Sequence, residues 1–230
     1  VVLTKSLQSY FIRAGVPAFK VQIAPDGVDL RLYKNLLDKE LARQKLQLPL
    51  EKKLVAYTGH LYPWKGVDTL IESAGLLPKV QFLLVGGTKI DQQRVNKLIQ
   101  KQGLSNVQLA GYKPPSKIPF YLMSADVLML PNSTYATISR EYTSPLKLFE
   151  YMAAKRPIVA TDLPSIREVL HNGRNAILVE PDNPEALAEG IKRVLDNPEL
   201  ANSIAAQARK DVEDYTWEKR SKKILQLINR

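Results

Sequence analysis

The hydrophobic positions of this chain fall into short continuous runs that are separated by longer amphipathic stretches. The runs do not alternate with polar residues, which is typical of strands buried on both faces of a sheet. The pattern therefore predicts β-strands over residues 54–57, 80–85, 107–109, 127–130, 158–160 and 176–179.

Between these runs, apolar residues recur at helical spacing, as at 67, 70, 71 and 74 and again at 95, 98 and 99. A capping side chain, often followed by Pro, indicates a helix start, because the side chain accepts a free backbone N–H and Pro lacks that donor. Such starts are predicted at Ser116, at Ser144 with Pro145, at Asn183 with Pro184, at Asn197 with Pro198, and at Thr216.

This alternation predicts an α/β fold with a doubly wound, parallel, Rossmann-like sheet. In such sheets, ligands bind beyond the carboxyl ends of the strands. The loops in which to look for a site are therefore residues 59–66, 86–91, 111–116, 131–144 and 162–165.

The first fifty residues fit this pattern less well. Residues 1–4, a helix to about residue 14, the run 21–24 and the turn 25–27 look like the end of a preceding domain, and a further helix is predicted over 32–46. We place the domain boundary near Gly27. Residues 1–27 would be the remainder of an N-terminal Rossmann-like domain, and 28–230 a second domain with C-terminal helices. The chain lacks an initiator Met, as a fragment would.

Composition narrows the range of functions. The chain is 45% hydrophobic, and 33 basic against 23 acidic side chains give a net charge of +10, a balance typical of a globular protein. Without Cys and with two His, no disulfide and no metal site are expected. The absence of Cys and of a signal peptide favours a cytoplasmic location.

The basic excess lies entirely in the first 120 residues. Such a surface could meet nucleic acid, anionic lipid or a phosphorylated substrate. Because no run of five or more Lys and Arg occurs, we expect no nucleic-acid partner.

The segment from Ser144 to Glu150 carries the most specific chemistry. A helix whose free N–H groups open onto a strand-end crevice binds anions. Glu150 lies one turn further along the helix that Pro145 would start, and its carboxylate can accept hydrogen bonds from both hydroxyls of a ribose. The segment therefore predicts a nucleotide site, although an ordinary cap and a solvated Glu150 would give the same pattern.

The loop after the first strand offers a second candidate group. Gly59 allows close approach of backbone to a ligand, and Lys65 can meet a phosphate. The spacing of a phosphate-binding P-loop is absent, and a lone loop lysine is usually only solvated.

These segments belong to a longer ordered set, comprising residues 59–71, 84–86, 107–112, 124–131, 145–153 and 157–162. The set resembles the donor-binding half of a family 4 retaining glycosyltransferase of the GT-B architecture. The resemblance extends to residues 24–29 and 176–188, and so covers nearly the whole chain.

The resemblance implies two Rossmann-like domains with a nucleotide-sugar between them, the N-terminal domain of the same protein being the partner of the second. In that family, Glu150 would hold the donor ribose, Lys65 the diphosphate, and Gly111, Tyr112 and Lys113 the nucleobase. The remaining donor contacts would come from Gly59, His60, Ser144, Pro145 and Leu146.

The sequence departs from the family pattern at two positions. The first Glu of the family's Glu-x7-Glu motif would lie at Tyr142, with Glu141 one residue out of register, so either a local bulge lets Glu141 serve or donor contacts differ. His60 stands where the family usually has Arg, which would make the diphosphate clamp weaker and sensitive to pH.

We therefore expect a metal- and cofactor-independent transferase that moves a sugar from a nucleotide-diphosphate donor to a glycan or lipid-linked acceptor with retention. Lys65 and Glu150 would be its catalytic groups in this chain. The chain alone would be inactive, and its basic half could dock peripherally on an anionic membrane. The alternatives are a non-catalytic nucleotide-binding module and a GT-B phosphorylase or epimerase.

Overall fold

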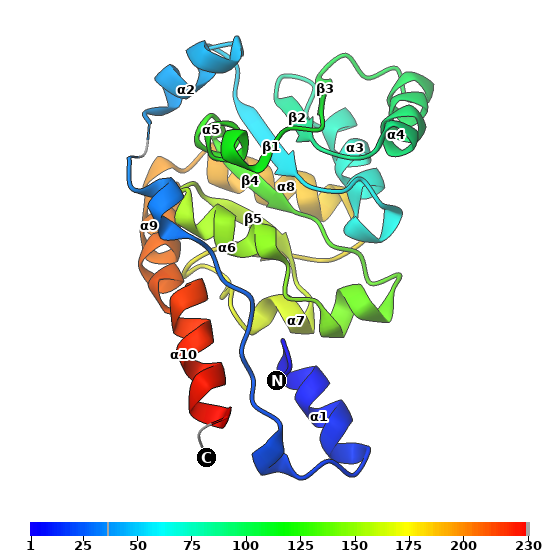
Figure 1. Cartoon of the computed structure of the whole chain (residues 1–230). Coiled ribbons are helices and arrows are strands. Elements are labelled where there is room, and N and C mark those ends of the chain that lie inside the picture. Colours follow the sequence, from blue (N-terminus) through cyan, green and yellow to red (C-terminus); the bar gives the residue numbers. More distant parts are fainter. Residues whose placement is uncertain (36, 229–230) are drawn as a thin grey trace.

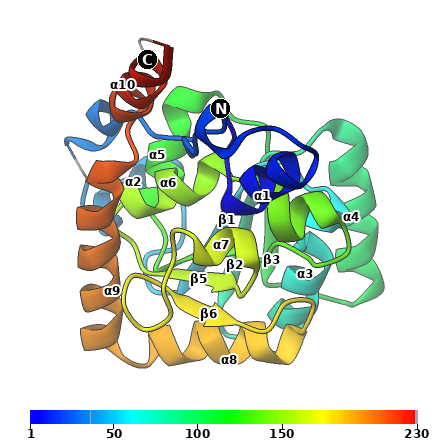
Figure 2. The ribbon, with the colours of Figure 1, turned by 90° about the horizontal axis from the view of Figure 1, so that it is seen from below.

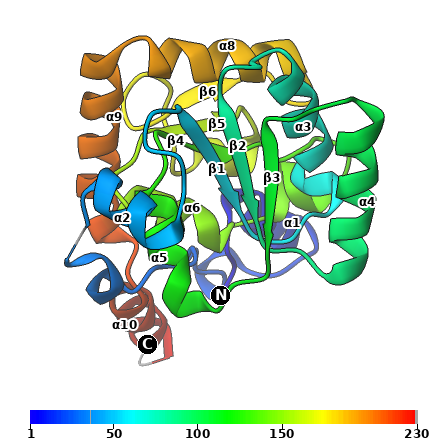
Figure 3. The ribbon, with the colours of Figure 1, turned by 90° about the horizontal axis from the view of Figure 1, so that it is seen from above.

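The computed structural model of the chain describes residues 1–35 and 37–228. Its centre is a six-stranded sheet in the order β3-β2-β1-β4-β5-β6, in which all neighbouring strands are parallel (Figures 1 and 3). This arrangement confirms the predicted doubly wound parallel sheet, and the strand ends differ from prediction by at most two residues. The strands are β1 (Leu54–Thr58), β2 (Gln81–Val85), β3 (Val107–Gly111), β4 (Val127–Leu130), β5 (Ile158–Thr161) and β6 (Ile177–Val179).

Ten α-helices surround the sheet in the described part of the chain. Figures 2 and 3 show α3, α4 and α8 on one side of the sheet and α5, α6 and α9 toward the other. The helices are α1 (Lys5–Arg13), α2 (Lys39–Leu46), α3 (Val67–Gly75), α4 (Lys89–Lys101), α5 (Ile118–Met123), α6 (Leu146–Ala153), α7 (Pro164–Arg167), α8 (Pro184–Leu195), α9 (Pro198–Asp211) and α10 (Trp217–Ile228).

Two clusters of buried side chains cover the two faces of the sheet. Tyr57 packs with the α3, α4 and α8 side, and its neighbour Ala56 with the α5 and α6 side. Successive strand residues point to opposite faces, so a strand that is apolar throughout must be covered on both. The continuous apolar runs in the sequence are therefore explained by two-sided burial.

The N-terminal segment is tied to the C-terminal helix. Val28 forms a parallel bridge with Thr216, and the Arg220 guanidinium donates to the carbonyls of Ala24 and Pro25. Figure 1 shows α1 and α10 on the same side of the molecule, below the carboxyl ends of the strands. The turn predicted near Gly27 is thus held against α10, while the assignment of residues 1–27 to a preceding domain stays a prediction.

Three local predictions are wrong. The helix expected over 32–46 is a 3₁₀ helix at Leu30–Tyr33 followed by α2, which begins only at Lys39. Ser116 caps no helix, because the two prolines before it induce a 3₁₀ helix at Pro115–Lys117 and α5 starts after that turn. Ser144 does not cap α6, whose N-cap position is occupied by Pro145.

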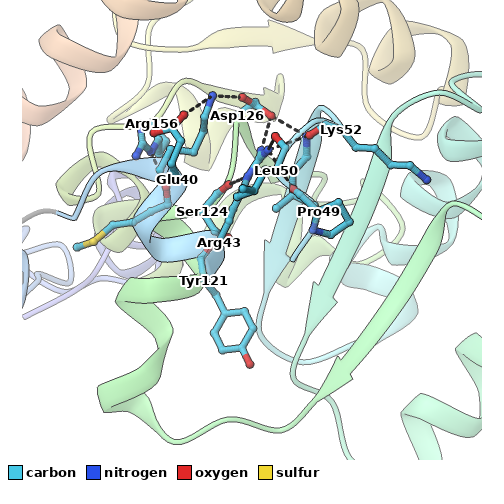
Figure 4. Close-up of polar contacts among 12 residues, drawn as sticks. Glu40, Arg43, Pro49, Leu50, Lys52, Tyr121, Ser124, Asp126 and Arg156 are labelled. Carbon is cyan, nitrogen blue, oxygen red and sulfur yellow. Dashed lines mark hydrogen bonds and ion pairs between the residues drawn. The ribbon is translucent and has the colours of Figure 1, made fainter. Parts of the chain in front are cut away.

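A buried arginine attaches α2 to the body of the domain at the amino ends of the strands. Arg43 is 2% exposed and donates to the carbonyls of Ser124, Leu50 and Lys52, and its Nη2 lies 2.7 Å from an Asp126 oxygen (Figure 4). Its five N–H donors suit such a cage of carbonyls. The sequence gives no local sign of this contact.

No helix within residues 1–35 and 37–228 is both long enough and apolar enough to cross a lipid bilayer.

Candidate ligand-binding site

The strand order reverses between β1 and β4, and the loops after these strands meet at the carboxyl edge of the sheet. Gly66 has a φ of +73°, and a Cβ there would lie 1.6 Å from the Pro131 carbonyl oxygen. The Trp64 carbonyl accepts hydrogen bonds from the Ser133 amide and the Ser139 hydroxyl, both at 3.2 Å. The loop at residues 59–66 is therefore packed directly against the segment after β4.

The start of the same loop is anchored to β2. The Gly59 amide donates to the Val85 carbonyl at 2.8 Å, and the Tyr57 phenol donates to the His60 carbonyl at 2.5 Å. The Gly86 amide in turn donates to the Gly111 carbonyl at 2.8 Å. These bonds align the ends of β1, β2 and β3 along one edge.

A pocket with a volume of about 360 Å³ opens at this edge. Four of the predicted residues line it, namely Gly59, His60, Tyr112 and Lys113, and the predicted Gly111 directly precedes Tyr112. Four more lining residues lie in the loop at residues 86–91 to which the sequence analysis pointed, and the structure adds three others: Gly86, Gly87, Thr88 and Lys89, then Val85, Gln92 and Ile118.

Two lysines and one carboxylate gather beside the pocket. The Nζ atom of Lys147, on the first turn of α6, lies 3.7 Å from the ring centre of Tyr57. A Cβ on Gly59 would lie 3.0 Å from the same Nζ atom. Lys65 lies over the Trp64 ring at 3.9 Å. Glu150, half-buried, follows Lys147 by one helical turn. This cluster, called here the cationic corner, consists of Lys65, Lys147 and Glu150.

Burial dominates the protonation of all three groups. It lowers the pKa of Lys65 to about 8. It lowers the pKa of Lys147 far below its usual range, and the charge of Lys65 lowers it further, against the opposing effect of Glu150. Burial raises the pKa of Glu150, and the charge of Lys147 opposes that rise. The corner therefore holds cationic groups that lack a full counter-charge.

The start of α6 differs in part from the prediction. The Ser144 hydroxyl accepts the Asp26 amide at 3.2 Å instead of capping the helix. Ser144 and Pro145 line a nearly closed space against Thr4 and Pro25. Leu146 is 51% exposed, and the first amides of α6 have no partner within the helix. The backbone at Leu146 and Lys147, and not the Ser144 hydroxyl, is the part of this start that can face a ligand.

The segment before α6 has an irregular turn around Glu141. Residues Ile138–Tyr142 form one π-helical turn. The Glu141 carboxylate pairs with Arg140 at 3.1 Å, and its carbonyl accepts from the Thr4 hydroxyl. Tyr142 makes an edge contact with the Tyr10 ring. Whether Glu141 meets a ligand stays a prediction.

Lys147 is the member of the cationic corner to which the sequence analysis gave no role. It interrupts the apolar stretch of α6 between Leu146 and Leu148 and lies three residues before Glu150. A lysine inside an otherwise apolar helix face was the signal available.

Two acidic residues after β5 contact other groups of the chain. Both Glu168 carboxylate oxygens accept the Lys5 amide, at 2.9 and 3.0 Å, and Asp162 pairs with Arg167. Trp64 lies in the turn just before α3. Within residues 1–35 and 37–228, no three His, Asp or Glu side chains cluster closely enough to hold a metal ion.

The arrangement combines three chemical features in one place. The pocket can receive a flat group, the cationic corner can hold negative charge, and Glu150 can accept hydrogen bonds from hydroxyls. This combination matches a molecule that carries a ring, an anionic link and a sugar.

Comparison with solved structures supports the same architecture. Sucrose-phosphate synthase from Thermosynechococcus elongatus superimposes with a TM-score of 0.85 and 26% identity over 99% of this chain and 57% of that one. HepE from Anabaena, solved in complex with UDP, gives a TM-score of 0.86 at 23% identity over 99% of this chain and 62% of its own.

Curated relatives of similar sequence are named glycosyltransferases. D-inositol 3-phosphate glycosyltransferase of Corynebacterium urealyticum is 24% identical over 94% of this chain and 53% of its own length. The Bacillus subtilis protein TuaC, named a putative teichuronic acid biosynthesis glycosyltransferase, is 29% identical over 81% of this chain and 45% of its own. The chain thus spans about half the length of these relatives.

The family described as glycosyl transferases group 1 matches residues 38–211, which is most of the chain and contains both the pocket and the cationic corner. This chain therefore belongs to the group 1 glycosyltransferase family.

Proposed function

We propose that this chain is the donor-binding half of a retaining glycosyltransferase that takes its sugar from a nucleotide-diphosphate donor. The observation that supports this most strongly is that the pocket, lined by the loops after β1, β2 and β3, lies next to the cationic corner, where Lys65 from the loop after β1 meets Lys147 and Glu150 of α6. Structural neighbours solved with UDP and with UDP-glucose support the choice of ligand class.

In this proposal, each part of the donor has its own contacts. The base enters the pocket between His60 and Tyr112, the ribose hydroxyls donate to Glu150, and the diphosphate lies at Lys65 and the start of α6. The acceptor, a glycan or a lipid-linked sugar, would be held mainly by a second domain, so the chain alone would bind donor without turning it over.

The chemical step needs charge stabilisation more than proton transfer from this half. The bond between the anomeric carbon and the diphosphate oxygen breaks, and its electron pair leaves with the diphosphate. The acceptor oxygen bonds to the same carbon, and its proton passes to the departing diphosphate oxygen or to water. Lys65 and the α6 amides stabilise the negative charge that develops on the leaving group. We propose that no metal ion is required, so EDTA should leave nucleotide binding unchanged.

The ribose contact is tested by calorimetry on Glu150→Gln. A thermal-shift panel of UDP, GDP, ADP and TDP first identifies the preferred base. The variant should then bind that nucleotide about ten- to a hundredfold more weakly, because a hydrogen bond to a charged group contributes about 1.5 to 3 kcal/mol. The matched control is Glu189→Gln, an exposed position on α8, which should bind like wild type.

A 2′-deoxy nucleotide completes a double-mutant cycle between the ribose hydroxyl and the Glu150 carboxylate. It should bind wild type more weakly than the ribonucleotide does, and the difference should shrink in Glu150→Gln, because the hydroxyl and the carboxylate act as a pair. Equal losses in both proteins would show that Glu150 does not contact the ribose.

A further inference from the structure

Lys147 occupies surroundings that a lysine rarely adopts without a partner. It is 9% exposed, and within residues 1–35 and 37–228 its Nζ atom donates no hydrogen bond. The contact with the face of Tyr57 at 3.7 Å is favourable for a cation but does not replace a hydrogen bond. An ammonium group in this position destabilises the ligand-free protein.

The surrounding charges do not neutralise Lys147. The ionisable groups that act on it are Lys65 from the loop after β1, Glu150 from the next turn of α6 and the Tyr57 phenol from the end of β1. The Tyr57 hydroxyl already donates to the His60 carbonyl. If both lysines are protonated, two cations face one partly desolvated carboxylate, so the cluster lacks the negative charge that would keep Lys147 protonated.

The position of Nζ connects it to the pocket. Gly59 lines that pocket, and its missing side chain leaves the space that the Lys147 ammonium group occupies, since a Cβ there would lie 3.0 Å from Nζ. Gly59 has a φ of +123°, which favours glycine. An anion bound at the backbone of Gly59 and His60 would therefore come within reach of Lys147 as well as Lys65.

We propose that Lys147 is a second binding residue for the donor diphosphate, which supplies the counter-charge that this buried side chain lacks in the free protein. This inference rests on the proposed function. It differs from a structural role for Lys147, because a structural lysine would stabilise the free protein, whereas this one is stabilised only when the ligand arrives.

The proposal also predicts that the protein takes up protons when the diphosphate binds. Burial holds the pKa of Lys147 far below its usual range in the free protein, and a bound diphosphate would raise it again. At pH 7.5, a nucleoside diphosphate is already fully ionised, since the second pKa of a phosphate is about 6. Protons that are taken up on binding at this pH would therefore bind mainly to groups of the protein and not to the nucleotide.

The test uses Lys147→Met, which keeps an unbranched side chain one atom shorter than that of lysine and removes the amine. Its matched control is Lys192→Met, an exposed lysine near the end of α8 at the opposite edge of the sheet. Calorimetry of the preferred nucleoside diphosphate in buffers with different ionisation enthalpies gives both the affinity and the number of protons taken up.

Lys147→Met should bind the nucleoside diphosphate at least about tenfold more weakly than wild type, while its affinity for the parent nucleoside stays unchanged. Wild type should take up protons on binding at pH 7.5, and the variant clearly fewer. The ligand-free variant should melt about 3 °C or more above wild type, because it no longer buries an amine that lacks a hydrogen-bond partner and whose charged form burial disfavours. Lys192→Met should match wild type in all three.

Unchanged diphosphate affinity and unchanged proton uptake in a folded Lys147→Met would overturn this inference and leave the proposed function intact. A lower melting temperature with unchanged affinity would show that the lysine is structural. If wild type binds no nucleoside diphosphate, the proposed function itself is wrong, and the inference with it.

Discussion

The Lys65 side chain shows how burial and function are linked at the scale of one residue. Its pKa lies at about 8, against 10.5 for a solvated lysine, because burial disfavours the charged form. An anionic ligand reverses that effect. In the ligand-free protein, the same shift should make folding more favourable as the pH rises from about 8 toward 10.5, since the unfolded state then binds more protons.

The dissociation constant of the nucleotide should therefore rise with pH from about pH 8, where Lys65 in the free protein loses its proton. This rise is an additional slope on top of any pH dependence that other groups cause. The slope can reach about tenfold in Kd for each pH unit. Calorimetry from pH 7 to pH 10 measures it.

The matched variant is Lys65→Arg, which stays charged throughout this range and should lose that additional slope. A slope that persists in Lys65→Arg would assign the titration to another group.

Sequence reasoning identified site residues where strand position alone determines location. Gly59, His60 and Tyr112 follow strands, and the parallel sheet brings their loops to one edge. It missed Lys147, because the burial of that side chain depends on Tyr57 and on the space left at Gly59, which lie far away in the sequence. For the same reason, it could not place the Ser144 hydroxyl on the Asp26 amide.

At the scale of elements, the contact between the loop at residues 59–66 and the segment after β4 holds the site in shape. Gly66 is where the two backbones touch. A Cβ there would overlap the Pro131 carbonyl, and backbone cannot move aside as a flexible side chain can.

Gly66→Ala should therefore lower the free energy of unfolding by about 3 kcal/mol or more, which combines the strain of a positive φ with a backbone clash. Urea denaturation measures this loss. Gly173→Ala is the matched control, because Gly173 shares the φ of +73° but faces open space. Equal losses in the two variants would mean that the clash is relieved at no cost and that the loop contact is not rigid.

The elements that the sequence predicted well are those with strong local signals. Asn183 and Asn197 cap α8 and α9 as expected, and the strand runs coincide with buried strands. The Ser116 error has a local cause, the two prolines before it, whereas the Ser144 hydroxyl is taken by the distant Asp26 amide. Arg43 attaches α2 through the nearby carbonyls of Leu50 and Lys52 and through Ser124 and Asp126, which lie about eighty residues away and leave no local signal.

At the scale of the whole molecule, the fold explains why the site lies at one edge. The loops after β1, β2 and β3 line the pocket at the carboxyl edge of the sheet, and the loop after β1 also packs against the segment after β4, where the strand order reverses. The sequence predicted this architecture, since each buried strand leaves a local signature.

The central claim is that the crevice between the loop after β1 and the start of α6 binds a nucleoside diphosphate. A crystal structure of this chain with the nucleotide selected by thermal shift tests it most directly. We expect the ribose hydroxyls within hydrogen-bond distance of Glu150, the diphosphate beside Lys65 and Lys147, and the base in the pocket at Tyr112. A nucleotide bound elsewhere, or a ribose turned away from Glu150, would contradict the account.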